Sequence, residues 1–96
     1  PGTFELPFAG KKLAQTHHLA AVIFLGCVIK GETEHDVYIN TSVAIALQTL
    51  NIEFDIPFIF GVLTPNNEQQ AIDRAGGKHG NKGVAAAVTA LKMSGM

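Results

Sequence analysis

Two apolar stretches decide the fold: LAAVIFLGCVI at residues 19–29 and IPFIFGVL at residues 56–63. Both stretches carry no charged residue and are rich in valine and isoleucine, which is typical of strands buried on both faces of a parallel sheet. The first stretch is also far shorter than the roughly 20 residues that span a bilayer. We therefore predict two buried strands and no membrane segment.

Segments with helical periodicity flank both predicted strands. Residues 5–16 and 39–50 repeat apolar side chains at helical spacing. Asn66 or Asn67 can cap a helix that runs to about residue 75. Apolar positions at the same spacing mark a last helix: Val84, Ala87, Val88 and Leu91.

The order of the predicted elements is helix, strand, helix, strand, helix, helix. This alternation favours the α/β class, with a parallel sheet and crossover helices. Two buried strands cannot form a sheet that four helices cover on both faces, and the chain opens on Pro1-Gly2, a turn signal, without a Met. We therefore expect a single domain over residues 1–96 that is incomplete at its N-terminus. An upstream segment would supply the missing strands, and other chains are the alternative source.

Composition excludes several classes of protein. With 47% hydrophobic and 16% charged residues, the chain has enough apolar surface to fold, which excludes disorder. Seven basic residues against eight acidic ones give a formal net charge of −1, so no basic field attracts nucleic acid or an anionic membrane. No secretory signal is visible. We expect a cytoplasmic protein and leave a plastid form open.

Cys27 is the only cysteine, so the chain cannot form an internal disulfide, which favours a reducing compartment. Its place in an apolar run predicts an inert core thiol. Together with His17 and His18 it lacks the spacing of metal ligands, so we expect no metal site and a solvated histidine pair.

The segment KGETEH, residues 30–35, follows the first predicted strand and opens the next helix. Ligands of open parallel sheets bind beyond the carboxyl ends of the strands. Gly31 would let the backbone approach a ligand, N–H groups at a helix start favour phosphate, and His35 can transfer protons near neutral pH. The pattern also fits a capped, solvated loop, because acidic residues in it would repel an anion.

Arg74, Lys78 and Lys82 recur every four residues across the end of a helix and a glycine-rich segment. Arginine suits bidentate phosphate contacts, so the three could form an anion clamp. They equally fit cations placed favourably at a helix C-terminus, followed by a turn. The glycines match neither a Walker A loop nor a dinucleotide fingerprint.

Four motifs in order resemble the 6,7-dimethyl-8-ribityllumazine synthase family: PGTFELP (1–7), GCVIKGETEH (26–35), PFIFGVLT (57–64) and NEQQAIDRAGGKHGNKG (67–83). They span nearly the whole chain. The resemblance implies a flavodoxin-like three-layer α/β/α fold with a four-stranded parallel sheet, of which this chain lacks the first βαβ unit of roughly fifty residues. It also implies homopentamers, often packed into icosahedral shells, with active sites between neighbouring subunits.

The resemblance further implies an enzyme, a transferase of riboflavin biosynthesis. Family members condense 5-amino-6-ribitylamino-uracil with 3,4-dihydroxy-2-butanone 4-phosphate to give 6,7-dimethyl-8-ribityllumazine, phosphate and water. An imine forms, phosphate leaves and the ring closes, with no metal or organic cofactor. Carried over by motif, His35 would shuttle protons. The pyrimidine and ribityl site would comprise Phe4, Glu5, Val28, Ile29, Phe60 and Lys82. The phosphate would be held by Gly31, Glu32, Thr33 and Arg74.

One departure from the family pattern follows the predicted proton shuttle. Asp36-Val37-Tyr38 stands where an aromatic residue and then an acid usually follow the histidine, so a carboxylate is displaced by about 100° around a helix. The aromatic that stacks on the pyrimidine is expected in the absent first strand. Three alternatives stay open: a non-catalytic relative that forms shells or binds a flavin-like ligand, a riboflavin synthase of the archaeal type, and a generic phosphate-binding α/β domain.

Overall fold

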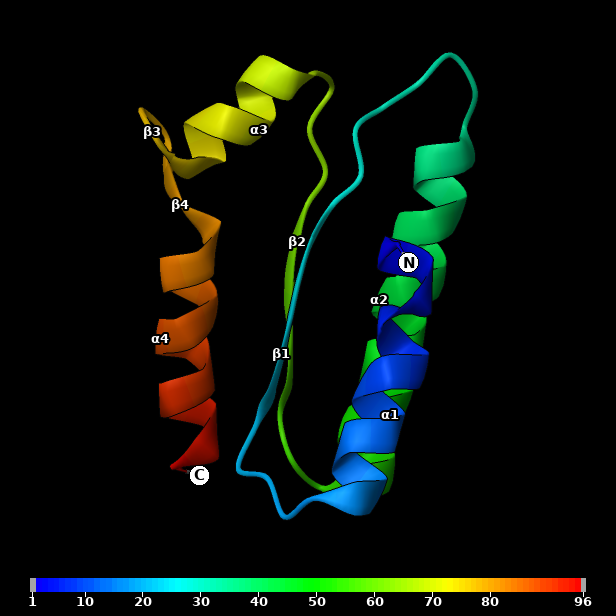
Figure 1. The fold of residues 1–96 in the computed structure, drawn as a ribbon, viewed down its shortest axis with the longest axis vertical. Helices are drawn as coiled ribbons and strands as arrows, with labels where there is room; N and C mark the ends of the chain where they lie inside the picture. The colour runs from blue at the N-terminus through cyan, green and yellow to red at the C-terminus, as the bar shows by residue number, and fades with distance from the viewer. Residues whose placement is uncertain (1, 96) are drawn as a thin grey trace.

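A computed structural model describes residues 2–95, and it has the predicted helices and strands in the predicted order, with two short strands added between the last two helices (Figure 1). In chain order the elements are η1 (Thr3–Glu5, a 3-10 turn), α1 (Leu6–Thr16), β1 (Val22–Cys27), α2 (His35–Phe54), β2 (Phe58–Leu63), α3 (Glu68–Arg74), β3 (Ala75–Gly77), β4 (Gly80–Asn81) and α4 (Lys82–Ser94). Pro1, which belongs to the predicted N-terminal break, lies outside the described residues. None of the helices within residues 2–95 is long and apolar enough to cross a membrane.

The sheet at the centre of the molecule is parallel, as predicted. β1 pairs with β2 from Val22 opposite Phe58 to Cys27 opposite Leu63. Beyond the strands, the Lys30 N–H donates to the Pro65 carbonyl at 2.9 Å. Because both carboxyl ends lie at one edge, the loops that follow β1 and β2 are brought together there.

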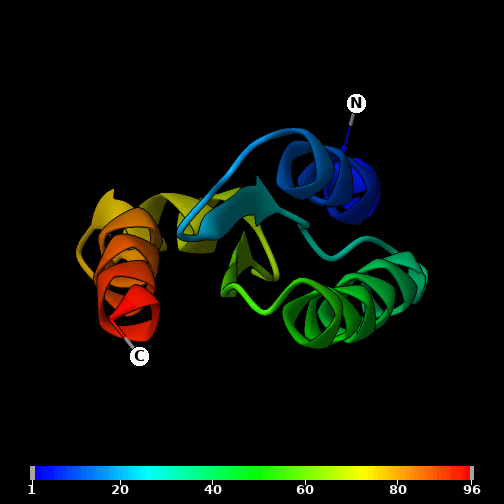
Figure 2. The same ribbon diagram turned by 90° about the horizontal axis from the view of Figure 1, so that it is seen from below.

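Helices cover both faces of this sheet. α1 and α2 lie on one face and α4 on the other, which gives the three-layer α/β/α arrangement (Figure 2). Over residues 2–95 the central sheet has two strands, β1 and β2, where the family resemblance implies four. The glycine-rich segment, which we predicted only as a break, forms a separate β3–β4 ladder, with Gly76 at φ 117° and Gly80 at φ 94°. These left-handed values favour glycine.

The main core lies between the sheet and α2. Phe24 and Phe58 from the strands pack with Val43, Leu47 and Leu50 of α2. α1 packs closely against the same aromatic cluster at Gly10. A Cβ at this position would overlap the ring of Phe24, so only glycine allows the close approach. The predicted apolar stripe of the second helix therefore faces the sheet.

The opposite face has a smaller core, made of Ile59 with Ala86 and Ala90 of α4. A Cβ at Gly61 would lie 2.7 Å from the Phe24 carbonyl oxygen and 3.3 Å from Cβ of Ala86, so glycine lets α4 pack tightly on β2. The apolar residues that predicted the last helix are not part of this core: Val84, Val88 and Leu91 are exposed.

The prediction that the first strand is buried on both faces is wrong within residues 2–95. Ile23 and Leu25 are 40% and 60% exposed, and Cys27, predicted as a core thiol, is exposed as well. Side chains alternate along a strand, so these three share the face opposite Phe24. α4 packs mainly on β2 and covers this face of β1 only in part. The second strand is buried along both faces, as predicted.

Candidate active site

A cavity of about 600 Å³ lies between η1 and the start of α2, and we call it the η1–α2 cavity. It brings together three residues that the sequence singled out from two distant segments: Phe4, Glu5 and His35. Its other lining residues were not predicted: Gly2, Thr3, Tyr38, Ile39 and Ser42. The cavity is thus lined by a carboxylate, an imidazole, the aromatic rings of Phe4 and Tyr38, and several hydroxyl groups.

Local capping interactions position the polar groups of this cavity. The Thr33 hydroxyl accepts from the backbone N–H of His35 at 3.3 Å, so the loop before α2 starts the helix at the histidine. The backbone N–H of Gly2 donates to Oε2 of Glu5 at 3.1 Å, which orients the carboxylate across the 3-10 turn. Positions three and four apart share a helix face, so α2 presents His35, Tyr38 and Ser42 to the same space.

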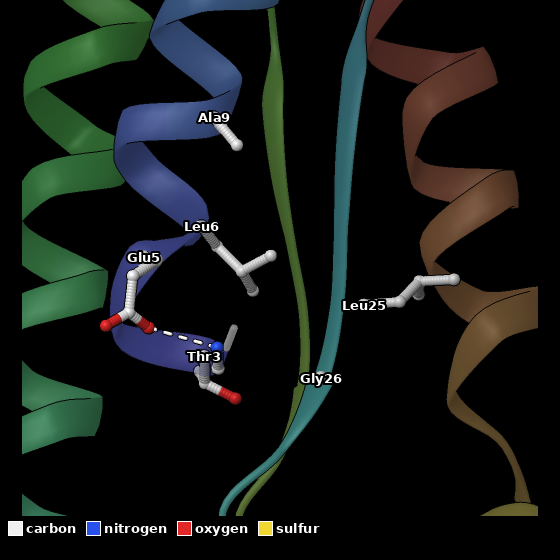
Figure 3. Close-up of a pocket in the computed structure, with 7 residues that line it drawn as sticks. Thr3, Glu5, Leu6, Ala9, Leu25 and Gly26 are labelled. Atoms are coloured by element: carbon white, nitrogen blue, oxygen red, sulfur yellow. Dashed lines mark hydrogen bonds between the residues drawn. The ribbon is translucent and has the colours of Figure 1, made fainter.

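A second pocket of about 370 Å³ adjoins the η1–α2 cavity and shares Gly2, Thr3 and Glu5 with it. Figure 3 shows that Leu6 points from α1 towards the strands, whereas Leu25 points towards α4. A Cβ at Gly26 would lie 2.9 Å from Oγ1 of Thr3. Glycine at this position therefore allows η1 to lie directly against the carboxyl-terminal half of β1, which fixes where Glu5 stands.

The loop after β1 holds five predicted site residues, none of which lines a cavity described here. Val28 is half-buried and hydrogen-bonds through its N–H to the Leu63 carbonyl, and Ile29 is 45% exposed. The three residues predicted to hold phosphate are exposed: Gly31, Glu32 and Thr33. A Cβ at Gly31 would meet no atom within 4 Å, so packing within the chain does not require a glycine there.

Arg74 and Lys82 line a different pocket, of about 430 Å³, together with Thr64, Asn66 and Gln70. We call it the Arg74–Lys82 pocket. The β3–β4 ladder joins the end of α3 to the start of α4 and so brings the two cations to one space. Lys78 lies between the two strands and is absent from the lining, so the structure brings together two of the three predicted clamp residues.

The caps of α3 and α4 support this pocket. The N–H of Gln70 donates to Oδ1 of Asn67 at 2.9 Å, which confirms a predicted cap. The N–H of Val84 donates to Oδ1 of Asn81 at 3.1 Å in the same way. These caps fix the starts of both helices.

Phe60 is half-buried and lines a groove of about 290 Å³ between β2 and α4, where it shares the lining with Lys82. The predicted site residues therefore fall into separate groups within one chain. His35 stands at the start of α2, while Arg74 ends α3, and these ends lie on opposite sides of the strands (Figures 1 and 2).

Asp36, the acid that departs from the family pattern, does not line the η1–α2 cavity. Its Oδ1 and that of Asn40, one turn later, are buried and accept no hydrogen bond from residues 2–95. The carboxylate of Asp36 therefore lies on a different face of α2 from the imidazole of His35. No group of three or more His, Cys, Asp or Glu side chains in the described part of the chain could hold a metal ion.

A parallel sheet between helical layers, with polar pockets near the carboxyl ends of its strands, defines an α/β protein of the class that binds small molecules at that edge. Comparison with known families makes the assignment specific. The profile of 6,7-dimethyl-8-ribityllumazine synthase matches residues 1–96, and the chain belongs to this family.

Several bacterial relatives share this similarity, and each is named 6,7-dimethyl-8-ribityllumazine synthase. The protein from Parabacteroides distasonis is 56% identical over 93 residues, which cover 97% of this chain and 58% of the relative. The protein from Cytophaga hutchinsonii is 57% identical over 93 residues, with the same two coverages. The protein from Porphyromonas gingivalis is 54% identical over 96 residues, which cover 100% of this chain and 60% of the relative. The chain thus spans little more than half the length of these relatives.

Proposed function

We propose that this protein condenses 5-amino-6-ribitylamino-uracil with 3,4-dihydroxy-2-butanone 4-phosphate to 6,7-dimethyl-8-ribityllumazine, as a transferase of riboflavin biosynthesis. The observation that carries the proposal is the η1–α2 cavity, which holds Phe4, Glu5 and His35 in a member of this family. The reaction requires close positioning of two substrates and a group that moves protons, and it uses no metal or organic cofactor in our proposal. Positioning alone can supply a large part of such a rate.

In this proposal the η1–α2 cavity binds the pyrimidine substrate. Glu5 accepts hydrogen bonds from ribityl hydroxyl groups, since a carboxylate only accepts. His35 moves protons while the 5-amino group adds to the ketone and water is lost to give the imine. Phosphate then leaves, and the ribitylamino nitrogen adds to the remaining carbonyl with loss of a second water, which closes the ring. Val28 and Ile29 contact the pyrimidine from the end of β1.

The phosphate of the second substrate is held, we propose, by the loop Gly31, Glu32 and Thr33 together with Arg74. The open space around the Cβ position of Gly31 supports this role, because glycine there would let a ligand reach the backbone. Arg74 supplies a fixed charge that suits phosphate oxygens. Lys82 and Phe60, from the Arg74–Lys82 pocket and the adjoining groove, complete the site.

We further propose that the site is shared between copies of the chain in a homopentamer, which can pack into an icosahedral shell. Two observations support self-assembly. The loop and Arg74 do not share a cavity within one chain. In addition, Ile45 and Ile52, seven residues apart on α2, are 62% and 84% exposed, and α4 exposes a second apolar stripe. Such surface is typical of interfaces between subunits.

The test is to mix the protein with both substrates and to follow the lumazine chromophore by absorbance, while light scattering reports the assembly. We expect a rate far above the uncatalysed condensation, from particles of pentamer size or larger. Folded, assembled protein that binds the pyrimidine but gives no acceleration would contradict the proposal and favour a non-catalytic relative.

A further inference from the structure

Two polar residues that α2 contributes to the η1–α2 cavity have no role in the proposed function: Tyr38 and Ser42. They follow His35 by three and seven positions, so α2 places them in one row along the cavity wall. The opposite wall comes from η1 and carries Glu5. Glu5 and His35 therefore make up only part of the cavity lining.

The chemistry of the two walls is complementary. Glu5 can only accept hydrogen bonds, and its Oε2 already accepts from the N–H of Gly2. A polyol has hydroxyl oxygens that accept as well as hydrogens that donate, so it requires donors on the protein. The hydroxyl groups of Tyr38 and Ser42 can do both, and neither makes a hydrogen bond within residues 2–95.

We propose that Tyr38 and Ser42 are specificity-determining residues that donate hydrogen bonds to the hydroxylated side chain of the pyrimidine substrate. This inference rests on the proposed function, because it concerns the substrate of the same cavity. In this inference, the hydroxyl groups of Tyr38 and Ser42 select a polyol chain over a plain alkyl chain. His35 lies in the same row of α2, at the end where the reaction takes place.

The test compares Tyr38→Phe and Ser42→Ala with the control Thr41→Val. The control removes a hydroxyl from the neighbouring position of α2, which does not line the cavity. We expect each test variant to raise KM for the ribityl pyrimidine about 3- to 10-fold, as the loss of one neutral hydrogen bond predicts, with kcat and the KM of the phosphate substrate within about twofold. The control is expected to match the unsubstituted protein.

A pyrimidine analogue with a 6-butylamino group in place of the ribityl chain separates specificity from structure. Because the analogue has no side-chain hydroxyl, the test variants and the unsubstituted protein should bind it equally in calorimetry. If the test variants lose affinity equally for the analogue and for the ribityl pyrimidine, or lose affinity for neither, the inference is overturned.

The same measurements distinguish failure of the proposed function from failure of this inference. If the unsubstituted protein binds the ribityl pyrimidine without turnover, the same variants tested by calorimetry decide the inference on binding alone. If it binds neither compound, both the proposed function and the inference are wrong.

Discussion

The two faces of the β1–β2 sheet differ in how completely the chain itself covers them. On the α1–α2 face, the ring of Phe58 lies 6.0 Å, centroid to centroid, from both Phe24 and Phe54, and three α2 side chains close the cluster. On the α4 face, Ile59 clusters with small alanine side chains, and much apolar surface of β1 and α4 remains exposed. The first face is a finished core, whereas the second leaves apolar side chains of β1 and α4 exposed.

The same contrast separates the two groups of candidate site residues. The η1–α2 cavity lies beside the finished core, so Glu5 and His35 are held by elements that pack on one another. The Arg74–Lys82 pocket is lined by the end of β2, the short helix α3 and the start of α4. We expect substitutions in the η1–α2 cavity to act within one chain and those in the Arg74–Lys82 pocket to depend on assembly as well.

The largest effect is expected at His35. His35→Ala should lower turnover by about 10²- to 10⁴-fold, the usual loss for a general acid–base group, with little change in substrate affinity. Stopped-flow absorbance of the lumazine product measures the rate and calorimetry the affinity. His79→Ala is the matched control, because this exposed histidine lines none of the described cavities. An unchanged rate for His35→Ala would remove it from the mechanism.

The next effect concerns the finished core. Phe24 is 3% exposed, so Phe24→Ala should lower the free energy of unfolding by about 3–5 kcal/mol through lost burial and a residual cavity. Its neighbour Leu25 points to the other face and is 60% exposed, so Leu25→Ala should cost less than about 1 kcal/mol. Urea unfolding measures the free energy of unfolding of both variants. Equal losses in the two variants would contradict the difference between the faces.

The third effect lies in the Arg74–Lys82 pocket. Arg74→Ala removes a charged donor, so affinity for the butanone phosphate should fall about 10- to 100-fold while affinity for the pyrimidine stays unchanged. Calorimetry with each substrate separately gives the two values. Lys78→Ala, outside the pocket, should leave both unchanged. Equal losses of both substrates in Arg74→Ala would argue against a phosphate role.

Sequence patterns predicted where the helices and strands lie in the chain better than they predicted how these elements pack. The uninterrupted apolar runs identified β1 and β2, and Asn67 identified the start of α3, because each signal is local. An apolar run does not encode which face a helix covers, so the exposure of Leu25 and Cys27 could not be inferred. The glycine-rich segment likewise gave no sign of the β3–β4 ladder, since glycine fits both a break and a turn between strands.

Sequence motifs supplied candidate residues for the site, and they did not indicate which of these residues share a cavity. Motifs pointed to Phe4, Glu5 and His35, and these do share a cavity. Tyr38 and Ser42 could have been found from their spacing to His35 along a predicted helix. The division between this cavity and the Arg74–Lys82 pocket depends on crossover geometry, which local spacing does not determine.

The smallest effect on chain stability is expected on the exposed stripe of α4. Leu91 is 76% exposed, so Leu91→Gln should change the free energy of unfolding by less than about 0.5 kcal/mol in dilute, dissociated protein. Ala90, the preceding residue, is 7% exposed against the sheet, so Ala90→Gln should cost about 1–3 kcal/mol by overpacking.

If α4 takes part in assembly, Leu91→Gln should nevertheless raise the concentration at which particles dissociate in analytical ultracentrifugation, and stability should then depend on protein concentration. Unchanged dissociation would restrict the assembly surface to other apolar regions such as Ile45 and Ile52 of α2. A stability loss as large as that of Ala90→Gln would mean that the α4 face is covered within the chain, which would remove the contrast between the two faces.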